Sequence, residues 1–220
     1  MKGYRADCVA QVLQSAVENY ADFLHYIQSL SAQNAQLEDN ILAEVFAKFN
    51  SVRFLTALRT GEFGVEQLNQ SIAEKLRQKG LLQFKHSRDW YLGQPVMVNR
   101  NDNNVGLFNG DIGIYLGNRR VWFETGDGYK SVSISRVPSH ETAFVMTVHK
   151  SQGSEFPHTF LVLPTENSPI LSKELIYTAL TRAKKQLTVF TAENIWKSAV
   201  RNPIKRQSGL GNLLSINNRA

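Results

Sequence analysis

The sequence predicts an α/β fold in which helices flank a mostly parallel sheet and a small β-barrel is inserted. Two observations indicate this fold. Apolar, β-branched runs alternate with amphipathic helical patterns before residue 93 and after residue 142. Between these parts, about 30 residues form short strands separated by Gly, Asn and Asp turns. We expect three segments: 1–108 and 141–220 as the two parts of the main domain, and 109–140 as the insertion.

The chain begins with two amphipathic helices. Apolar residues recur at spacings of three and four from Val9 to Leu30, and again from Leu37 to Phe49. The Ser-Ala-Gln-Asn run at 31–34 predicts a turn between them. We expect this hairpin to pack on the rest of the domain and to carry no chemistry.

The α/β rhythm follows on both sides of the insertion. Residues 51–58 are short, apolar and β-branched, as in a buried strand, and a basic turn at 59–61 leads to a helix over 65–77. The later elements that we expect are strands at 93–100, 143–148, 159–164 and 186–192, and helices at 172–185 and 193–200. Ser172 can cap its helix, and Glu174 in the first turn favours the helix dipole.

The inserted segment contains the apolar runs 111–117, 119–125 and 129–137. Gly126-Asp127-Gly128 between two of them is typical of a hairpin turn, because these residues tolerate positive φ angles. Trp122 and Phe123 point to opposite faces of their strand. One is expected in the barrel core, and the other either packs there too or stacks on a base.

Composition excludes several classes of protein. With 42% hydrophobic residues the chain can bury a core, which excludes wholesale disorder. No run of 18 apolar residues and no apolar signal segment occurs, and the single Cys8 excludes a disulfide framework. We therefore expect a cytoplasmic protein. The net charge is +6, and seven bases against one acid lie between Arg182 and Arg206, which indicates either a polyanion partner or a solvated basic surface.

A polar turn at 147–155 follows a predicted buried strand, where ligands bind in parallel α/β sheets. Thr147, His149 and Ser151 could donate hydrogen bonds to phosphate oxygens. Gly153 would let the backbone approach a ligand, and Glu155 could accept a hydrogen bond from a ribose hydroxyl. The alternative is an ordinary polar turn after a strand.

The helix predicted over 172–185 has two distinct faces. Its apolar face comprises Leu175, Ile176, Ala179, Leu180 and Ala183, and its polar face comprises Thr178, Thr181, Arg182 and Lys185. On the polar face, Arg182 is either a permanently charged fork for phosphate or a plain surface arginine.

Several catalytic signatures are absent from the sequence. It contains no Gly-x-x-x-x-Gly-Lys-Ser/Thr loop, no convincing Walker-B carboxylate pair, no Cys/His metal spacing and no Gly-x-Ser-x-Gly elbow. If the protein handles a nucleoside triphosphate, it supplies only part of the site.

Two segments resemble motifs V and VI of superfamily 1 helicases: VMTVHKSQGSEF (145–156) and LIYTALTRAKKQLTVF (175–190). The runs at 95–102 and 106–113 resemble the segment before the SH3-like domain of RecD-type helicases, and 57–69 resembles their motif IV region. RQSGL (206–210) resembles the ending of the RecD family, the alpha subunits of exodeoxyribonuclease V. The resemblance implies a second RecA-like motor domain with an SH3-like insertion, and a C-terminal fragment whose P-loop domain is missing.

The resemblance also implies roles for individual residues. Arg182 is similar to the motif VI arginine that contacts the γ-phosphate of ATP, and Arg59 to a motif IV arginine. Gly153 and Glu155 match positions near the nucleotide, with Glu155 at the ribose. The residues implied to contact DNA are Thr147, His149, Ser151, Asn101 and Asn109. A histidine in such a turn can instead bond its own backbone.

As a function, the resemblance implies an ATP-dependent 5′-to-3′ DNA helicase acting in double-strand break repair and recombination. Its cofactors would be ATP and Mg²⁺, held mainly by the missing motor domain. Its partners would be single- and double-stranded DNA and the RecB-like beta and RecC-like gamma subunits, with nuclease chemistry in the beta subunit. A stand-alone RecD-like helicase and a non-catalytic DNA-binding or assembly module remain alternatives. The fragment alone is expected to be inactive.

Overall fold

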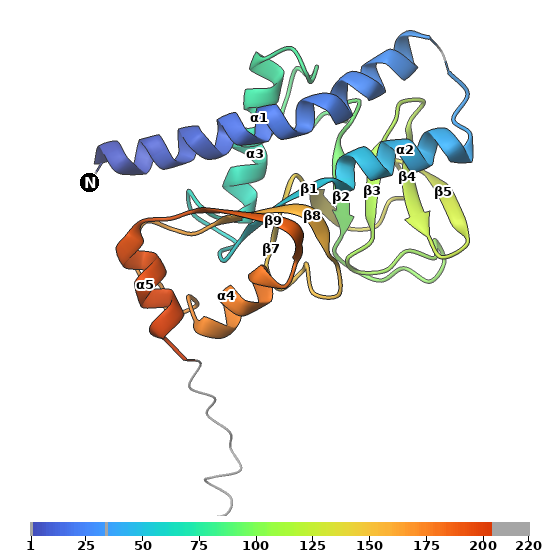
Figure 1. The fold of residues 1–220 in the computed structure, drawn as a ribbon. Coiled ribbons are helices and arrows are strands. Elements are labelled where there is room, and N and C mark those ends of the chain that lie inside the picture. Colours follow the sequence, from blue (N-terminus) through green and yellow to red (C-terminus); the bar gives the residue numbers. More distant parts are fainter. Residues whose placement is uncertain (1, 34, 204–220) are drawn as a thin grey trace, which may run out of the picture.

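The computed structural model describes residues 2–33 and 35–203, with side chains from residue 7 onward. Four parallel strands form the main sheet in the order β7-β1-β8-β9 (Figure 1). They are β1 (Val52–Thr56), β7 (Val145–Thr147), β8 (Phe156–Val162) and β9 (Ala183–Phe190). Thr56 pairs with both Thr147 and Val162, so β1, β7 and β8 end at the same level. We call this the carboxyl edge, and the edge where β8 and β9 begin the amino edge.

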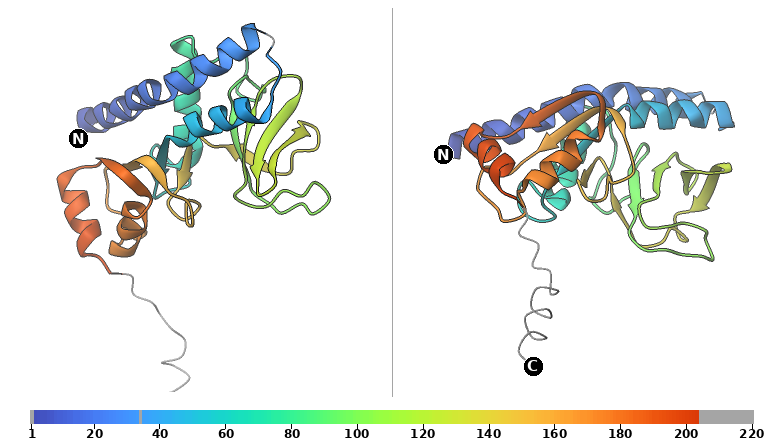
Figure 2. Two further views of the ribbon diagram at one scale, coloured as in Figure 1. Left: turned by 45° about the vertical axis from the view of Figure 1, so that its right-hand side comes forward. Right: turned by 60° about the horizontal axis from the view of Figure 1, so that its bottom comes forward.

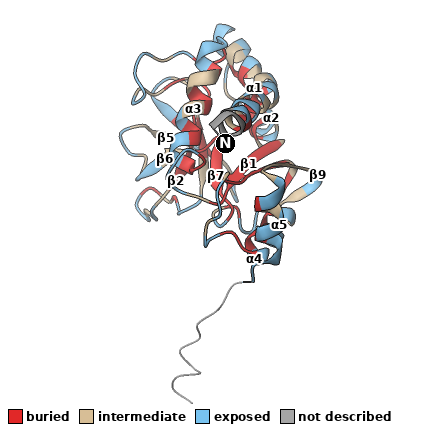
Figure 3. Ribbon diagram, turned by 90° about the vertical axis from the view of Figure 1, so that its left-hand side faces the viewer, coloured by how far each residue is buried: buried red, intermediate tan, exposed pale blue. Residues whose placement is uncertain are grey.

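Helices cover both faces of this sheet. On one face lie α1 (Lys2–Ala32), α2 (Asp39–Asn50) and α3 (Val65–Gln78), and on the other lie α4 (Lys173–Leu180) and α5 (Glu193–Arg201) (Figure 1). Alternating strand residues point into the two cores: Phe54 packs with α1 to α3, and Leu55 with α4 and α5. Figure 3 shows β1 and β7 buried in the interior and β9 less covered at the margin. The predicted α/β class is confirmed.

The predicted helical hairpin is confirmed as α1 and α2. Residues at the predicted spacing are buried on one side of α1, among them Val12, Tyr20 and Phe23. The Tyr20 hydroxyl donates a 2.7 Å hydrogen bond to the Phe144 carbonyl, which ties the middle of α1 to the segment entering β7. The hairpin therefore packs along the sheet, as expected.

Five antiparallel strands form a second sheet in the order β5-β4-β3-β2-β6. They are β2 (Pro95–Val98), β3 (Ile112–Tyr115), β4 (Arg120–Thr125), β5 (Gly128–Ser133) and β6 (His140–Thr142). Both views in Figure 2 place this sheet at the opposite end of the molecule from α4 and α5. The sheet extends beyond the expected 109–140 segment, because the strand predicted at 93–100 pairs with β3 and β6. The division into segments and the SH3-like class of the sheet stay predictions.

The predicted hairpin joins β4 and β5. Thr125 pairs with Gly128, which has a φ of 114°, so two residues form the turn. Phe123 fills the core of the small sheet and is fully buried. Trp122 is half-buried and packs against the main core, so both aromatic side chains serve packing.

The helix predicted over 172–185 is shorter in the structure. The Ser172 cap is confirmed, since its hydroxyl accepts a 3.2 Å hydrogen bond from the Leu175 amide. However, α4 ends at Leu180, which is 44% exposed, and Ala183 begins β9. The expected continuation of the helix through Arg182 and Lys185 is wrong, because pairing with β8 satisfies the backbone of these residues instead.

Some expectations fall on residues 204–220, which lie outside the described residues. They are the RQSGL segment at 206–210 and the polar tail at 207–220. In the part of the chain that is described, we find no helix both long and apolar enough for a membrane span.

Candidate functional site

The turn between β7 and β8, residues 148–155, connects the two edges of the parallel sheet. It leaves β7 after Thr147 at the carboxyl edge, where the Val148 amide donates to the Thr56 carbonyl at 3.0 Å. It enters β8 at Phe156, at the amino edge. Seven residues of β8 span roughly 20 Å between the two levels. The motif turn therefore contributes residues to both edges. Ser151 links them, because its amide donates to the Thr147 carbonyl at 3.2 Å and its carbonyl accepts from Arg182.

At the amino edge, Arg182 is held against this turn. Its Nη1 donates to the carbonyls of Ser151 (3.3 Å) and Ser154 (3.0 Å). Its Nε donates to the Thr178 carbonyl at 3.2 Å, and its Nη2 to the Thr181 hydroxyl at 3.0 Å. The backbone amide of Phe156 donates to the Arg182 carbonyl at 2.8 Å, which fixes the start of β9 beside β8.

All four of these partners are neutral, so none of them compensates the charge of Arg182. The side chain is half-buried rather than enclosed in the core. A guanidinium has five N–H groups, and this geometry leaves one on Nη2 without a partner among the described residues. Such an arginine can bind an anion without being rearranged.

Gly153 and Glu155 lie at the same edge. Gly153 has a φ of 85° and is exposed, with no heavy atom within 4 Å of the position that a Cβ would take. A glycine is therefore required by the backbone and leaves space for a ligand. Glu155 is 56% exposed and lies 3.8 Å from the Lys184 ammonium. It also borders a hollow of about 360 Å³ between α2, the small sheet and the start of β8.

At the carboxyl edge, two predicted hydroxyls are engaged by the turn itself. The Thr147 Oγ1 accepts a 3.2 Å hydrogen bond from the Lys150 amide, and the Ser151 hydroxyl donates to the Val148 carbonyl at 2.7 Å. Ser151 is fully buried, whereas Thr147 keeps a little exposed surface. In this conformation both residues shape the turn, and a direct contact from Ser151 would require the turn to change.

His149 is exposed at the tip of the turn. It borders a hollow of about 820 Å³ that also involves Gln152, Pro169 and the first turn of α4. No hydrogen bond of its ring within the described residues ties it to its own backbone. His149 is thus accessible to a ligand.

Asn101 and Asn109 are brought to this edge by the loop between β2 and β3. The Asn101 Oδ1 accepts a 2.8 Å hydrogen bond from the Asn109 amide, so Asn101 orders the loop. The Asn109 Oδ1 accepts a hydrogen bond from the Lys150 ammonium. The small sheet and the motif turn are therefore joined at residues that were predicted to contact nucleic acid.

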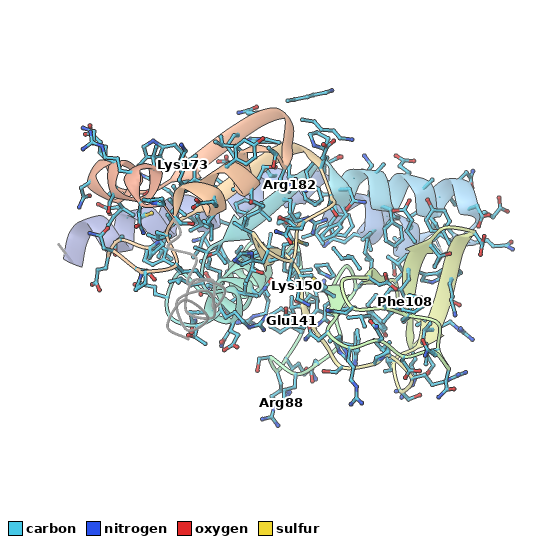
Figure 4. The ribbon with its side chains drawn as sticks, turned by 90° about the horizontal axis from the view of Figure 1, so that it is seen from below. Arg88, Phe108, Glu141, Lys150, Lys173 and Arg182 are labelled. Carbon is cyan, nitrogen blue, oxygen red and sulfur yellow. The ribbon has the colours of Figure 1, made fainter. Side chains whose placement is uncertain are left out.

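The structure does not bring Arg59 to Arg182. Arg59 follows β1 at the carboxyl edge, and its Nη2 lies 2.8 Å from Oε2 of Glu141 in β6. Figure 4 shows Arg182 set apart from Glu141. The predicted nucleotide group therefore separates into Gly153, Glu155 and Arg182 at the amino edge and Arg59 at the carboxyl edge.

Three residues near the predicted site were not predicted from the sequence. Lys150 lies inside the motif turn, Glu141 is a charged residue just before a buried strand, and Phe108 precedes Asn109 with 51% of its surface exposed (Figure 4). The signal for Lys150 was its place in the motif. Phe108 and Glu141 carry no such signal, because the exposure of one and the partner of the other depend on the tertiary structure.

Comparison with known proteins agrees with this architecture. Residues 142–190, from β6 to the end of β9, match the family model of the UvrD-like helicase C-terminal domain. The parallel sheet with helices on both faces, together with this match, is that of a RecA-like α/β domain. The "RecBCD enzyme subunit RecD" of Haemophilus influenzae is 56% identical over 214 residues, which cover 94% of this chain and 33% of that protein.

The "ATP-dependent RecD2 DNA helicase" of Deinococcus radiodurans is 28% identical, over 68% of this chain and 21% of that protein. Among solved structures, a Bacteroides Pif1 helicase in complex with ADP-AlF3 and ssDNA matches 92% of this chain and 54% of its own, with 16% identity and a TM-score of 0.44. The chain is a homologue of the RecD-type superfamily 1 helicases. It spans about a third of the length of the Haemophilus relative.

Proposed function

We propose that the chain forms the second motor domain of an ATP-dependent 5′-to-3′ DNA helicase. The whole protein would be the alpha subunit of a RecBCD-like exodeoxyribonuclease V, acting in double-strand break repair and recombination. The 56% identity to a RecBCD subunit supports this proposal. ATP and Mg²⁺ would be held mainly by a P-loop domain in another part of the polypeptide.

The geometry of Arg182 carries the proposal. Its guanidinium is held by four neutral partners, and no ion pair compensates its charge within the described residues. Across a cleft between two motor domains, it would contact the γ-phosphate of ATP and stabilise the charge that develops during phosphoryl transfer. Glu155 would accept a hydrogen bond from the ribose, and Gly153 would let the backbone approach the nucleotide.

The carboxyl edge would hold single-stranded DNA. His149 is exposed there, and Asn109 and Lys150 are joined across the two sheets. Thr147 would present its hydroxyl to the DNA backbone, while Ser151 and Asn101 would support the turn and the loop. Closure of the two motor domains on ATP and their opening after hydrolysis would alternate the grip on the strand.

In the assembled enzyme the partners would be the RecB-like beta and RecC-like gamma subunits. We assign no DNA-cleaving residue to this chain. A stand-alone helicase is the second candidate, favoured by the similarity to the Deinococcus enzyme. Co-purification of the full-length protein with two large subunits would support the first candidate, and recovery of an active single subunit would support the second.

The test uses the longer polypeptide that contains the P-loop domain. We expect Arg182→Ala to lower ATP hydrolysis by about 10³-fold or more, by analogy with arginine fingers, and to change the dissociation constant of ATP much less. Arg182→Lys retains the charge but loses the planar guanidinium with its several N–H donors, so it should recover only part of the rate of hydrolysis.

The matched control is Arg77→Ala, which removes an exposed arginine of α3 that is paired with Glu74. Hydrolysis by this variant should equal that of the unmodified protein. The Arg182→Ala variant could also hydrolyse ATP at the rate of the unmodified protein, with an unchanged melting temperature. In that case the proposed contact of Arg182 with the γ-phosphate would be wrong.

A further inference from the structure

The two cations at the carboxyl edge share one arrangement. Arg59 and Lys150 leave the parallel sheet from neighbouring strands, since Thr56 and Thr147 are paired residues at the ends of β1 and β7. Each cation is then bonded to a residue of the small sheet or its loop. Glu141 of β6 binds Arg59, and Asn109 of the β2–β3 loop binds Lys150.

The Arg59–Glu141 pair is asymmetric in burial. The Arg59 side chain is 51% exposed, whereas the Glu141 side chain is only 18% exposed. Oε1 of Glu141 is buried and has no hydrogen-bond partner within the described residues, so Arg59 provides the main compensation of this carboxylate. Because the carboxylate of Glu141 is largely buried and needs its cationic partner, it restricts where the Arg59 guanidinium can lie.

The exposed half of the guanidinium remains available. One of its five N–H groups donates to Glu141, and no other hydrogen bond of the Arg59 side chain is formed with the described residues. The free N–H groups lie on the same edge as Lys150 and Thr147. A guanidinium fixed on one side and open on the other is suited to a phosphate oxygen.

We propose that Arg59 binds the phosphodiester backbone of single-stranded DNA, and that Glu141 is a positioning residue that holds Arg59 at this edge. The inference rests on the proposed function, because it takes the carboxyl edge as the DNA-binding side. It assigns Arg59 to DNA instead of to ATP. The small sheet thereby sets the spacing of the two cations, Arg59 through Glu141 and Lys150 through Asn109.

The first test measures binding of a fluorescent oligothymidylate to the chain at several salt concentrations. Arg59→Ala removes one phosphate contact, so the slope of log K against log salt should become shallower by about 0.7, with weaker binding at low salt. Arg59→Lys keeps the charge and should retain the slope. Arg77→Ala is the matched control, because Arg77 is also an exposed arginine paired with a glutamate, Glu74.

The second test separates positioning from charge. Removal of an acid beside a DNA site should strengthen binding if only the overall potential matters. We expect the opposite for Glu141→Gln, which keeps the size of the side chain but weakens the hold on Arg59: binding should weaken by roughly 2–5-fold. In an Arg59→Ala background, Glu141→Gln should cause no further weakening. Stronger binding by the Glu141→Gln single variant would overturn the positioning role.

A third measurement distinguishes DNA from nucleotide as the source of the phosphate. In the longer polypeptide, Arg59→Ala should leave the dissociation constant of ATP unchanged in the absence of DNA. A loss of ATP affinity there, or an unchanged salt slope in the first test, would overturn the inference while leaving the proposed function intact. Failure of the unmodified chain to bind the oligonucleotide at all would instead reject the DNA-binding side of the proposed function, and this inference with it.

Discussion

Arg53 in β1 shows how far a single residue can depart from its sequence pattern. It is fully buried in a strand predicted to be apolar, between the rings of Phe49 and Phe156 at 4.2 and 4.8 Å. Its Nη2 donates to the Asn50 side chain at 2.8 Å and its Nη1 to the Ala143 carbonyl at 3.2 Å. Burial lowers the pKa of Arg53, because the charged form loses water. The aromatic faces and the two oxygens offset part of that loss.

Gly113 in β3 provides a test at the same scale. A Cβ at this position would lie 2.5 Å from the Phe123 ring and 2.7 Å from the Val121 side chain, and both residues are fully buried. We expect Gly113→Ala to lower the free energy of unfolding by about 1–3 kcal/mol, as overpacking does.

The matched control for Gly113 is Gly126→Ala in the hairpin turn, where a Cβ would meet no heavy atom within 4 Å. Urea denaturation followed by circular dichroism measures both variants. Equal stability of the Gly113→Ala variant and the unmodified chain would show that the small sheet can expand at this point.

At the scale of elements, α1 is tied to the sheet by Tyr20, and this contact predicts a pH dependence. Burial raises the pKa of Tyr20 from its ordinary value of 10 to about 12. The folded state therefore favours the neutral phenol. The contribution of this preference to the free energy of unfolding is fully present below pH 10. It is lost as the pH rises from 10 to 12, by about 3 kcal/mol in total. We expect the free energy of unfolding to fall steeply in this window.

Tyr20→Phe should make that fall shallower, although it also removes the hydrogen bond to Phe144 and lowers stability at neutral pH. Part of the fall should remain, because burial also raises the pKa of Tyr91. Tyr177→Phe changes an exposed tyrosine of α4 and serves as the control. Chemical denaturation at pH 9 to 12 measures these free energies of unfolding. If their slope against pH were the same in Tyr20→Phe as in the unmodified chain, the pH dependence would not come from Tyr20.

The elements themselves were largely predictable from the sequence, and their connections were not. Periodicity identified α1, α2 and α3, and the Ser172 cap identified the start of α4. The end of α4 was missed because helix propensity continues past Leu180, whereas tertiary pairing with β8 begins at Ala183. Likewise, nothing local in residues 95–98 indicates which of two sheets they join. The split of Arg59 from Arg182 has the same origin, because spacing along the chain does not specify the edge of a sheet.

At the scale of the whole molecule, the domain places its candidate site residues at two edges of one sheet. The amino edge has Arg182 and Glu155, and the carboxyl edge has Arg59, Lys150 and His149. The turn at 148–155 joins the two edges directly. Within residues 35–203, neither edge contains a Gly-x-x-x-x-Gly-Lys loop that could enclose a triphosphate. In the proposed function, the domain would therefore supply side chains to a nucleotide held mainly by another domain.

We therefore expect the chain alone to show no steady-state ATP hydrolysis, since its sequence contains no phosphate-binding Gly-x-x-x-x-Gly-Lys loop. A coupled assay of ADP release, with oligothymidylate present, measures this. The longer polypeptide with the P-loop domain is the positive control. Sustained turnover by the purified chain would contradict the half-site model.

The exposed margin of the parallel sheet has a practical consequence. β9 is an edge strand of eight residues, and only its first half carries the exposed lysines Lys184 and Lys185. Its second half, from Leu187 to Phe190, is half-buried and uncharged, and no other strand in the described part of the chain pairs with its outer backbone groups. Purified material should therefore self-associate as its concentration rises, and a charged substitution late in β9 would keep it monodisperse for spectroscopy.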